Sequence, residues 1–247
     1  ELRNTGLFSV VNFINGFVAP SFLFASGMAY AVTTRRKIGS YLSFGFPLFQ
    51  QFGRLVLILL IGYCLHLPRF QLYRITHGVE PQEWSVFFQS DVLHCIAVSL
   101  LILQVLLLML RTERRLYRAT AVIACAILFA TPLVWGYDFL AIFPAPLAAY
   151  MNGLHHSLFP LFPWSAFLFA GAIAGYLFAK GRAAAGETGA EKFPTLALRR
   201  FLLAGGGLVL ISFPLMTLAR VYPTYDYWHS SPSFVIFRIG VVLLLFA

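Results

Sequence analysis

The residues best suited to chemistry lie at the start of a long apolar stretch. Asp91 and His94 are three positions apart, at the head of an almost unbroken apolar run that reaches Leu110. At that spacing two side chains share one face of the first helical turn. A carboxylate can orient a nearby imidazole and raise its basicity, so the pair is typical of general-base or nucleophilic catalysis. The structural alternative is that Asp91, after Ser90, is a helix N-cap and His94 bonds a backbone group.

Three further groups of polar residues lie near apolar stretches. Asn15 could donate a hydrogen bond to a thioester oxygen as charge develops on it. Trp164 could contact a substrate, although a tryptophan at the end of an apolar stretch also fits the aromatic belt of a membrane interface. The groups are Asn12 with Asn15, His155 with His156 before Phe159 to Trp164, and Trp228 to Pro232 followed by Arg238.

Arg238 has an unusual position for a charged residue. It follows the start of its apolar stretch by about six residues, which is roughly 9 Å along a helix. A charge at that depth is expected to face the interior of a helical bundle and to have a partner there. Asp91, Asp138 or Asp226 could supply that partner.

The composition indicates which elements must position these residues. The chain is 60% hydrophobic and 11% charged, with a mean hydropathy of +0.80. Soluble domains are about half apolar and about a quarter charged. We therefore predict an all-α, polytopic membrane bundle that forms a single domain over residues 1–247. Because the chain begins without Met and ends inside an apolar run, we expect it to be truncated at both ends.

The apolar stretches predict about seven membrane spans and one shorter segment. Asp138 to Met151 is apolar, but Pro144 and Pro146 interrupt it and it is too short to cross a bilayer, which takes roughly 20 residues. We interpret it as a re-entrant or interfacial segment. The predicted spans are 11–32, 47–67, 91–110, 119–135, 158–178, 198–218 and 234 onward.

The basic residues predict the orientation of these spans. Segments 33–54, 111–118 and 180–200 hold thirteen of the eighteen Lys and Arg residues, whereas the intervening segments 68–91, 136–156 and 220–232 hold three. Because Lys and Arg concentrate in cytoplasmic loops, we expect the first set of segments to be cytoplasmic and the second to lie outside. The same bias explains the net charge of +9 without a nucleic-acid partner.

The histidines follow the opposite pattern. All six fall at predicted outer helix ends or in outer loops, and the orientation rule does not require this because neutral His contributes nothing to it. The alternative is that polar residues cap helices wherever helices end. The six are His66, His77, His94, His155, His156 and His229. The three cysteines lie in apolar segments without metal-ligand spacing, so we predict no metal site.

Four stretches in order resemble the bacterial relatives of heparan-α-glucosaminide N-acetyltransferase, within the transmembrane acyltransferase superfamily. They are Asn15-Gly-Phe-Val-Ala-Pro-Ser-Phe-Leu-Phe-Ala-Ser-Gly27, Asp91-Val-Leu-His-Cys-Ile96, Phe159-Pro-Leu-Phe-Pro-Trp164, and Ser231-Pro-Ser233 leading to Arg238. The resemblance implies a larger bundle, of which this chain is the central part. It also implies transfer of an acetyl group from cytosolic acetyl-CoA to a sugar amine or hydroxyl on the far side of the membrane.

The resemblance also implies site residues. The family's principal His would lie upstream of residue 1, and Asn15 stands where some relatives carry a His. We expect Asp91, His94 and Asn15 to take part in catalysis. Arg residues match phosphate as a planar fork, so some could hold the phosphates of acyl-CoA, although the cytoplasmic charge bias alone accounts for them. The other candidates are His155, His156, Trp164, His229 and Arg238 for the acceptor, and Arg54, Arg115 and Arg200 for CoA.

Two other functions stay open at this point. Intramembrane charge and the proline-interrupted segment would also suit a transporter or permease for a small solute, although no inverted repeat is evident. A scaffold subunit without a site would leave Asp91, His94 and Arg238 unexplained. The sequence leaves open the acceptor sugar, N- versus O-acylation and whether the chain forms a homodimer. The bacterial relatives suggest the bacterial inner membrane.

Overall fold

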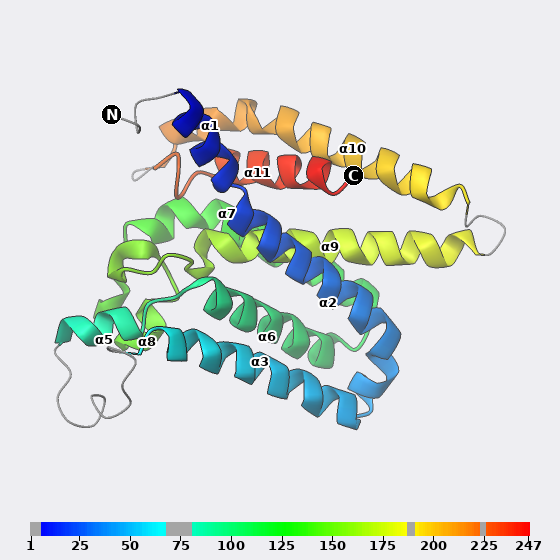
Figure 1. Cartoon of the computed structure of the whole chain (residues 1–247), viewed down its shortest axis with the longest axis horizontal. Coiled ribbons are helices and arrows are strands. Elements are labelled where there is room, and N and C mark those ends of the chain that lie inside the picture. The colour runs from blue at the N-terminus through cyan, green and yellow to red at the C-terminus, as the bar shows by residue number, and fades with distance from the viewer. Residues whose placement is uncertain (1–5, 68–80, 187–190, 223–225) are drawn as a thin grey trace.

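The computed structural model describes residues 6–67, 81–186, 191–222 and 226–247, and these form a bundle of roughly antiparallel helices without strands (Figure 1). The α-helices are α1 Gly6–Asn15, α2 Val18–Leu42, α3 Phe46–Leu65, α5 Pro81–Phe87, α6 Val92–Leu110, α7 Glu113–Trp135, α8 Ala145–Ala148, α9 Leu161–Ala185, α10 Phe193–Ser212 and α11 Pro232–Leu245. Short 3₁₀ helices are η3 Phe139–Ala141, η4 Gly153–His155 and η5 Pro214–Arg220.

The predicted all-α membrane bundle is confirmed. Among the described residues, six helical segments are long and apolar enough to cross a membrane. They contain α2, α3, α6, α7, α9 and α10, while the seventh predicted span corresponds to α11, which is apolar but only 14 residues long. Between residues 138 and 151 the structure has only η3 and α8, so this segment forms no crossing helix.

The first predicted span differs from the structure at both ends. A turn at Gly16 and Phe17 separates α1 from α2, and α2 then continues to Leu42 instead of ending near Val32. Three basic residues near position 36 suggested a loop, but Arg35 forms an ion pair with Glu113 of α7 at 2.8 Å. The basic segment is therefore the last part of α2 and not a loop, and it has a partner on a neighbouring helix.

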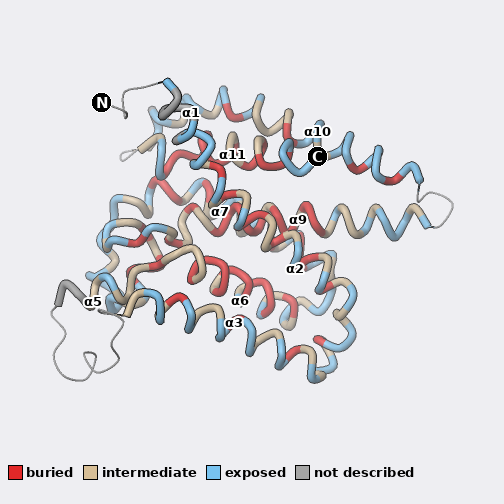
Figure 2. The backbone as a smooth tube through the Cα atoms, in the orientation of Figure 1, coloured by how far each residue is buried: buried red, intermediate tan, exposed pale blue. Residues whose placement is uncertain are grey.

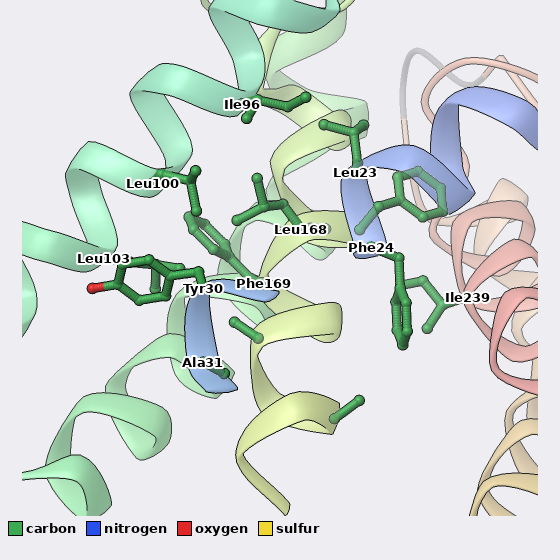
Figure 3. Packing of buried hydrophobic residues seen from close by; sticks show 14 of the residues in the cluster. Leu23, Phe24, Tyr30, Ala31, Ile96, Leu100, Leu103, Leu168, Phe169 and Ile239 are labelled. Carbon is green, nitrogen blue, oxygen red and sulfur yellow. The ribbon is translucent and has the colours of Figure 1, made fainter. Parts of the chain in front are cut away.

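The core lies along α2, α6 and α9. Figure 2 shows the buried stretches gathered on α6, α9 and α11, whereas α3 and α10 are mostly exposed. Leu23, Phe24, Leu103, Leu168 and Phe169 are fully buried. In Figure 3 Leu103, Leu168 and Phe169 lie between α2, α6 and α9, whereas Phe24 lies on the side toward Ile239 of α11. This core holds the start of α6, which carries Asp91 and His94, against its neighbours.

The helix connections divide the bundle into two ends. The basic end holds the connections α2–α3, α6–α7 and α9–α10, and the histidine end holds the opposite connections with α5, α8 and residues 136–160 (Figure 1). The predicted cytoplasmic segments therefore share one end of the molecule. His77, Arg69 and Arg74 lie outside the described residues.

Candidate active site

A capping box begins α6 and positions His94. The Asp91 carboxylate accepts a hydrogen bond from the Val92 backbone N–H at 2.6 Å, and the Asp91 backbone N–H donates to His94 Nδ1 at 3.3 Å. In this arrangement the N-cap side chain bonds the first turn and the third helical residue reaches back to the N-cap. We expected the Asp91 carboxylate to orient the imidazole, but a backbone N–H does so, because the carboxylate caps the helix instead.

The hydrogen bond to Nδ1 defines what His94 can offer to a ligand. Since Nδ1 accepts, a neutral His94 ring carries its proton on Nε2 and donates from there. The side chain is fully buried, and Nε2 has no hydrogen-bond partner among the described residues. A buried donor without a partner costs about 1–3 kcal/mol. Nε2 is therefore a buried donor whose hydrogen-bonding capacity is unused among the described residues.

Residues of α3 and of the segment after α8 surround this ring. The Tyr63 ring meets the His94 imidazole edge-on at a centroid distance of 4.3 Å, and the Tyr63 hydroxyl is hydrogen-bonded to the Tyr150 hydroxyl at 3.0 Å. Burial and this hydrogen bond raise the pKa of Tyr150, so its hydroxyl stays protonated. His66 lies with its ring centroid 5.9 Å from that of His94.

Hydrogen bonds of Ser90 connect the residues before α9 with the start of α6. The Ser90 backbone N–H donates to Ser157 Oγ and the Ser90 hydroxyl donates to the Phe159 carbonyl, both at 2.9 Å. The backbone N–H groups of Leu158 and Phe159 donate in return to the Ser90 carbonyl. These bonds fix the segment that carries Tyr150 beside His94.

A cavity of about 330 Å³ runs between α2, α3 and α6. Its lining extends along α2 from Phe22 to Tyr41, which is roughly 28 Å of helix. On α6 the lining includes Leu93, the neighbour of His94, and on α3 it includes Arg54 nearer the basic end. The cavity therefore extends from the first turn of α6 toward the basic end, and its lining includes Leu93 but not His94.

Polar side chains line this cavity within an otherwise apolar bundle. Ser26, Tyr30, Thr34 and Gln51 all contribute to the wall. Tyr30 donates a hydrogen bond to Gln104 Oε1 at 3.3 Å. Thr34 Oγ1 and Gln104 Nε2 are buried without a partner among the described residues. Buried polar atoms in a protein interior are normally paired. Of these two residues only Thr34 lines the cavity, so its hydroxyl is the one that a polar ligand there could reach.

A comparison with known families identifies the family of the chain. A family model described as heparan-alpha-glucosaminide N-acetyltransferase, catalytic, matches residues 2–210. The chain belongs to this family. The family is one of membrane acetyltransferases, and the resemblance drawn from the sequence is confirmed, although the stretch from Ser231 to Arg238 lies beyond the matched range. No curated protein and no solved structure gives a significant match to the chain.

Two histidines at the histidine end of this acetyltransferase bond aspartates of their own connections. His155 Nε2 lies 3.0 Å from Asp138 Oδ1, and His229 Nδ1 lies 2.6 Å from Asp226 Oδ2. The Leu140 backbone N–H and His155 hold the pKa of Asp138 below its usual range. Partial burial alone would raise the pKa of Asp226, but the interactions with His229 and the hydrogen bond from the Trp228 backbone N–H together outweigh it and lower that pKa.

The other predicted acceptor residues lie in three different surroundings. His156 is exposed, with a left-handed backbone at φ 63°. Trp164 packs edge-on against Phe159 at 4.7 Å. The Arg238 guanidinium lies over the Phe234 ring at 4.1 Å. Among the described residues Arg238 pairs with none of the three aspartates we expected, and its Nε is buried without a partner.

The predicted CoA-binding arginines do not converge in the structure. Arg54 lines the cavity that leads toward His94. Arg200 lines a different, apolar cavity of about 420 Å³ between α9, α10 and α11. Arg115 is exposed near the start of α7, and Asn15 is exposed at the end of α1. Over the described residues no group of three His, Cys, Asp or Glu could hold a metal ion.

Sequence reasoning missed the residues that surround His94. Tyr63, His66 and Tyr150 lie far from Asp91 along the chain, so no spacing rule connects them to it. His66 was included in the one-sided histidine pattern, and that pattern was the signal that could have selected it.

Proposed function

We propose that this chain transfers the acetyl group of acetyl-CoA to an amine or hydroxyl of a sugar, with the reaction centred on His94. The observation that carries the proposal is the cavity between α2, α3 and α6. It leads from Arg54 toward the turn that bears His94, in a chain that belongs to an acetyltransferase family. A reaction that joins a donor from one side of a membrane to an acceptor on the other needs such a passage.

The lining of this cavity suits the chemistry of CoA. A guanidinium matches the planar face of a phosphate with two parallel hydrogen bonds, so Arg54 would hold the diphosphate near the basic end. The pantetheine arm carries two amides, and Tyr30, Thr34 and Gln51 offer hydroxyl and amide groups for them. Binding of such amides would satisfy Thr34 Oγ1, which is buried without a partner among the described residues.

The reacting thioester would then lie beside His94. The imidazole Nε2–H can donate a hydrogen bond to the thioester oxygen, which gains negative charge as the acceptor attacks the carbonyl carbon. The capping box fixes the ring before the substrate arrives, so the donor needs little reorganisation during the reaction. Because the side chain is fully buried, water competes poorly for this donor.

The two ends of the bundle would serve the two substrates. We place the basic end in the cytosol, where acetyl-CoA is made, and the histidine end outside, with the bacterial inner membrane as the location. His155, His156, Trp164, His229 and Arg238 remain the candidates for contact with the acceptor. An amino sugar or a hydroxyl of a cell-wall or lipopolysaccharide sugar would fit this placement.

The test uses the complete protein in lipid nanodiscs with labelled acetyl-CoA and a panel of amino sugars. Wild-type protein should label at least one sugar. Arg54→Gln should raise the KM for acetyl-CoA about tenfold or more, because a hydrogen bond to a charged group contributes about 1.5–3 kcal/mol. Arg114→Gln, which changes an exposed arginine elsewhere at the basic end, is the control and should leave that KM unchanged.

Two results would contradict the proposal. If the wild-type protein labels no sugar, the proposed acyl transfer to a sugar is wrong. If Arg54→Gln and Arg114→Gln have the same KM for acetyl-CoA, the cavity is not the path of the donor. Uptake of an unmodified solute into liposomes by the same protein would instead favour the transporter alternative.

A further inference from the structure

The Nε2 atoms of His66 and His94 have opposite hydrogen-bonding roles: that of His66 accepts and that of His94 donates. His66 Nδ1 lies 2.9 Å from the Gly62 carbonyl oxygen. A carbonyl oxygen only accepts hydrogen bonds, so Nδ1 of a neutral His66 carries the proton and its Nε2 keeps a free lone pair. His94 has the reverse arrangement, because its Nδ1 accepts from the Asp91 backbone N–H and its Nε2 therefore donates.

Both rings contact the same residue of α3. His66 bonds the carbonyl of Gly62, and the His94 ring lies so close to Gly62 that a Cβ there would be 2.7 Å from its Cε1. The two ring centroids are 5.9 Å apart and the ring planes are inclined at 52°. A Brønsted base and a hydrogen-bond donor therefore lie side by side at the histidine end.

The two rings differ in their access to solvent. His94 is fully buried, whereas His66 is half-buried at the end of α3. The acceptor must reach the site from the histidine end, and it must lose a proton when its nitrogen or oxygen bonds to the acetyl carbon. His66 is the partly accessible imidazole of the two. Its Nε2 has no hydrogen-bond partner among the described residues, so it can take that proton.

The neighbouring groups suit this task less well. The Tyr63 and Tyr150 hydroxyls bond each other, and burial raises the pKa of Tyr150, so that hydroxyl does not become a base near neutral pH. The Asp91 carboxylate accepts a backbone N–H at the helix start. A neutral His94 presents only a donor, because its Nδ1 lone pair is already used.

We propose that His66 is the general base of the transfer, in place of the His that the resemblance implies upstream of residue 1, and that His94 is the donor to the thioester oxygen; this inference rests on the proposed function. The acceptor N–H or O–H gives its proton to His66 Nε2 while its heteroatom bonds to the acetyl carbon. The carbonyl oxygen becomes negatively charged and accepts from His94 Nε2–H. When the carbonyl re-forms, the C–S bond breaks, and the proton on His66 passes to the departing thiolate of CoA.

His66→Asn tests this assignment without removing the structural bond. The Asn amide N–H can occupy the place of Nδ1–H and donate to the Gly62 carbonyl, but Asn has no counterpart to Nε2. A purely structural role predicts nearly unchanged activity. A general-base role predicts that the kcat for acetyl transfer falls about 100-fold or more, since such catalysis contributes about 10²–10⁴-fold. Cys64→Ser, at an exposed position two residues earlier, is the control and should keep wild-type activity.

Rescue by added imidazole gives a second readout. In His66→Ala, imidazole in the buffer should raise the remaining activity at least tenfold, because the place of the missing ring is open at the histidine end. In His94→Ala it should restore none, because that position is closed to solvent. Size-exclusion profiles and thermal unfolding temperatures that match the wild type would show that the variants fold.

The possible failures can be told apart. Wild-type protein that transfers no acetyl group would overturn both proposals. An active wild type with His66→Asn within twofold of it would overturn the His66 assignment alone. Imidazole that rescued His94→Ala and not His66→Ala would overturn that assignment as well.

Discussion

At the scale of single residues, Gly62 leaves the space that the His94 imidazole fills. A Cβ at position 62 would lie 2.7 Å from His94 Cε1 and 3.0 Å from Nδ1. Real Cβ contacts are not that short, and the buried ring has little room to move away. The position of the donor Nε2 therefore depends on a residue of another helix that has no side chain.

Gly62→Ala should consequently displace the His94 ring and reduce acetyl transfer. A misplacement of about 1 Å at a reacting centre can reduce the rate about 100-fold, and we expect a loss of kcat of that order. Gly53→Ala, on the same helix with no atom within 4 Å of its Cβ position, is the matched control and should be as active as the wild type. Equal rates for the two variants would show that the ring position does not matter.

At the scale of helices, glycines bring α2 and α9 into close contact. A Cβ on Gly27 would collide with the Leu168 carbonyl, and one on Gly171 would collide with the Phe24 carbonyl. Gly175 makes a third close approach, where a Cβ would lie 2.7 Å from the Met28 carbonyl. Small residues let membrane helices approach closely, and Gly171 and Gly175 are four residues apart on the same helix face.

Gly171→Val should therefore separate α2 from α9 and destabilise the bundle. Overpacking a core costs about 1–3 kcal/mol, and we expect a loss near the upper end because the colliding atoms belong to the backbone. Thermal unfolding in detergent would measure this loss of stability, with the decrease of the monodisperse size-exclusion peak as the readout. Gly206→Val on α10, where no atom lies within 4 Å, is the comparison; an equal loss there would argue against the α2–α9 contact.

The helices were more predictable from the sequence than their ends or the site. Apolar runs long enough to cross a bilayer identified six of the spanning segments because burial in lipid requires such runs. The end of α2 could not be read from basic residues, because the ion pair between Arg35 and Glu113 depends on how α2 meets α7. The contact of His94 with Tyr63 and His66 likewise depends on the packing of α3 against α6.

At the scale of the whole molecule, the separation of basic and histidine ends predicts a sidedness. With the exposed native cysteines Cys64 and Cys125 replaced, a cysteine at Ala145 should react with an impermeant maleimide in intact cells. A cysteine at Ala184 should react only after lysis, because we expect the basic end in the cytosol. Both positions are exposed, so accessibility does not bias the comparison. The reverse labelling would invert the orientation and with it the assignment of donor and acceptor sides.

The two imidazoles are carried by different helices, and one of those helices is peripheral. His66 ends α3, which lies mostly exposed at the edge of the bundle, whereas His94 begins the buried α6. The distance between the rings is therefore set by how far α3 slides along α6. Bilayers thicker or thinner than its apolar length make a helix tilt or shift at modest energy. The rate of acetyl transfer would then vary with the acyl-chain length of the surrounding lipids, so the enzyme would respond to membrane thickness.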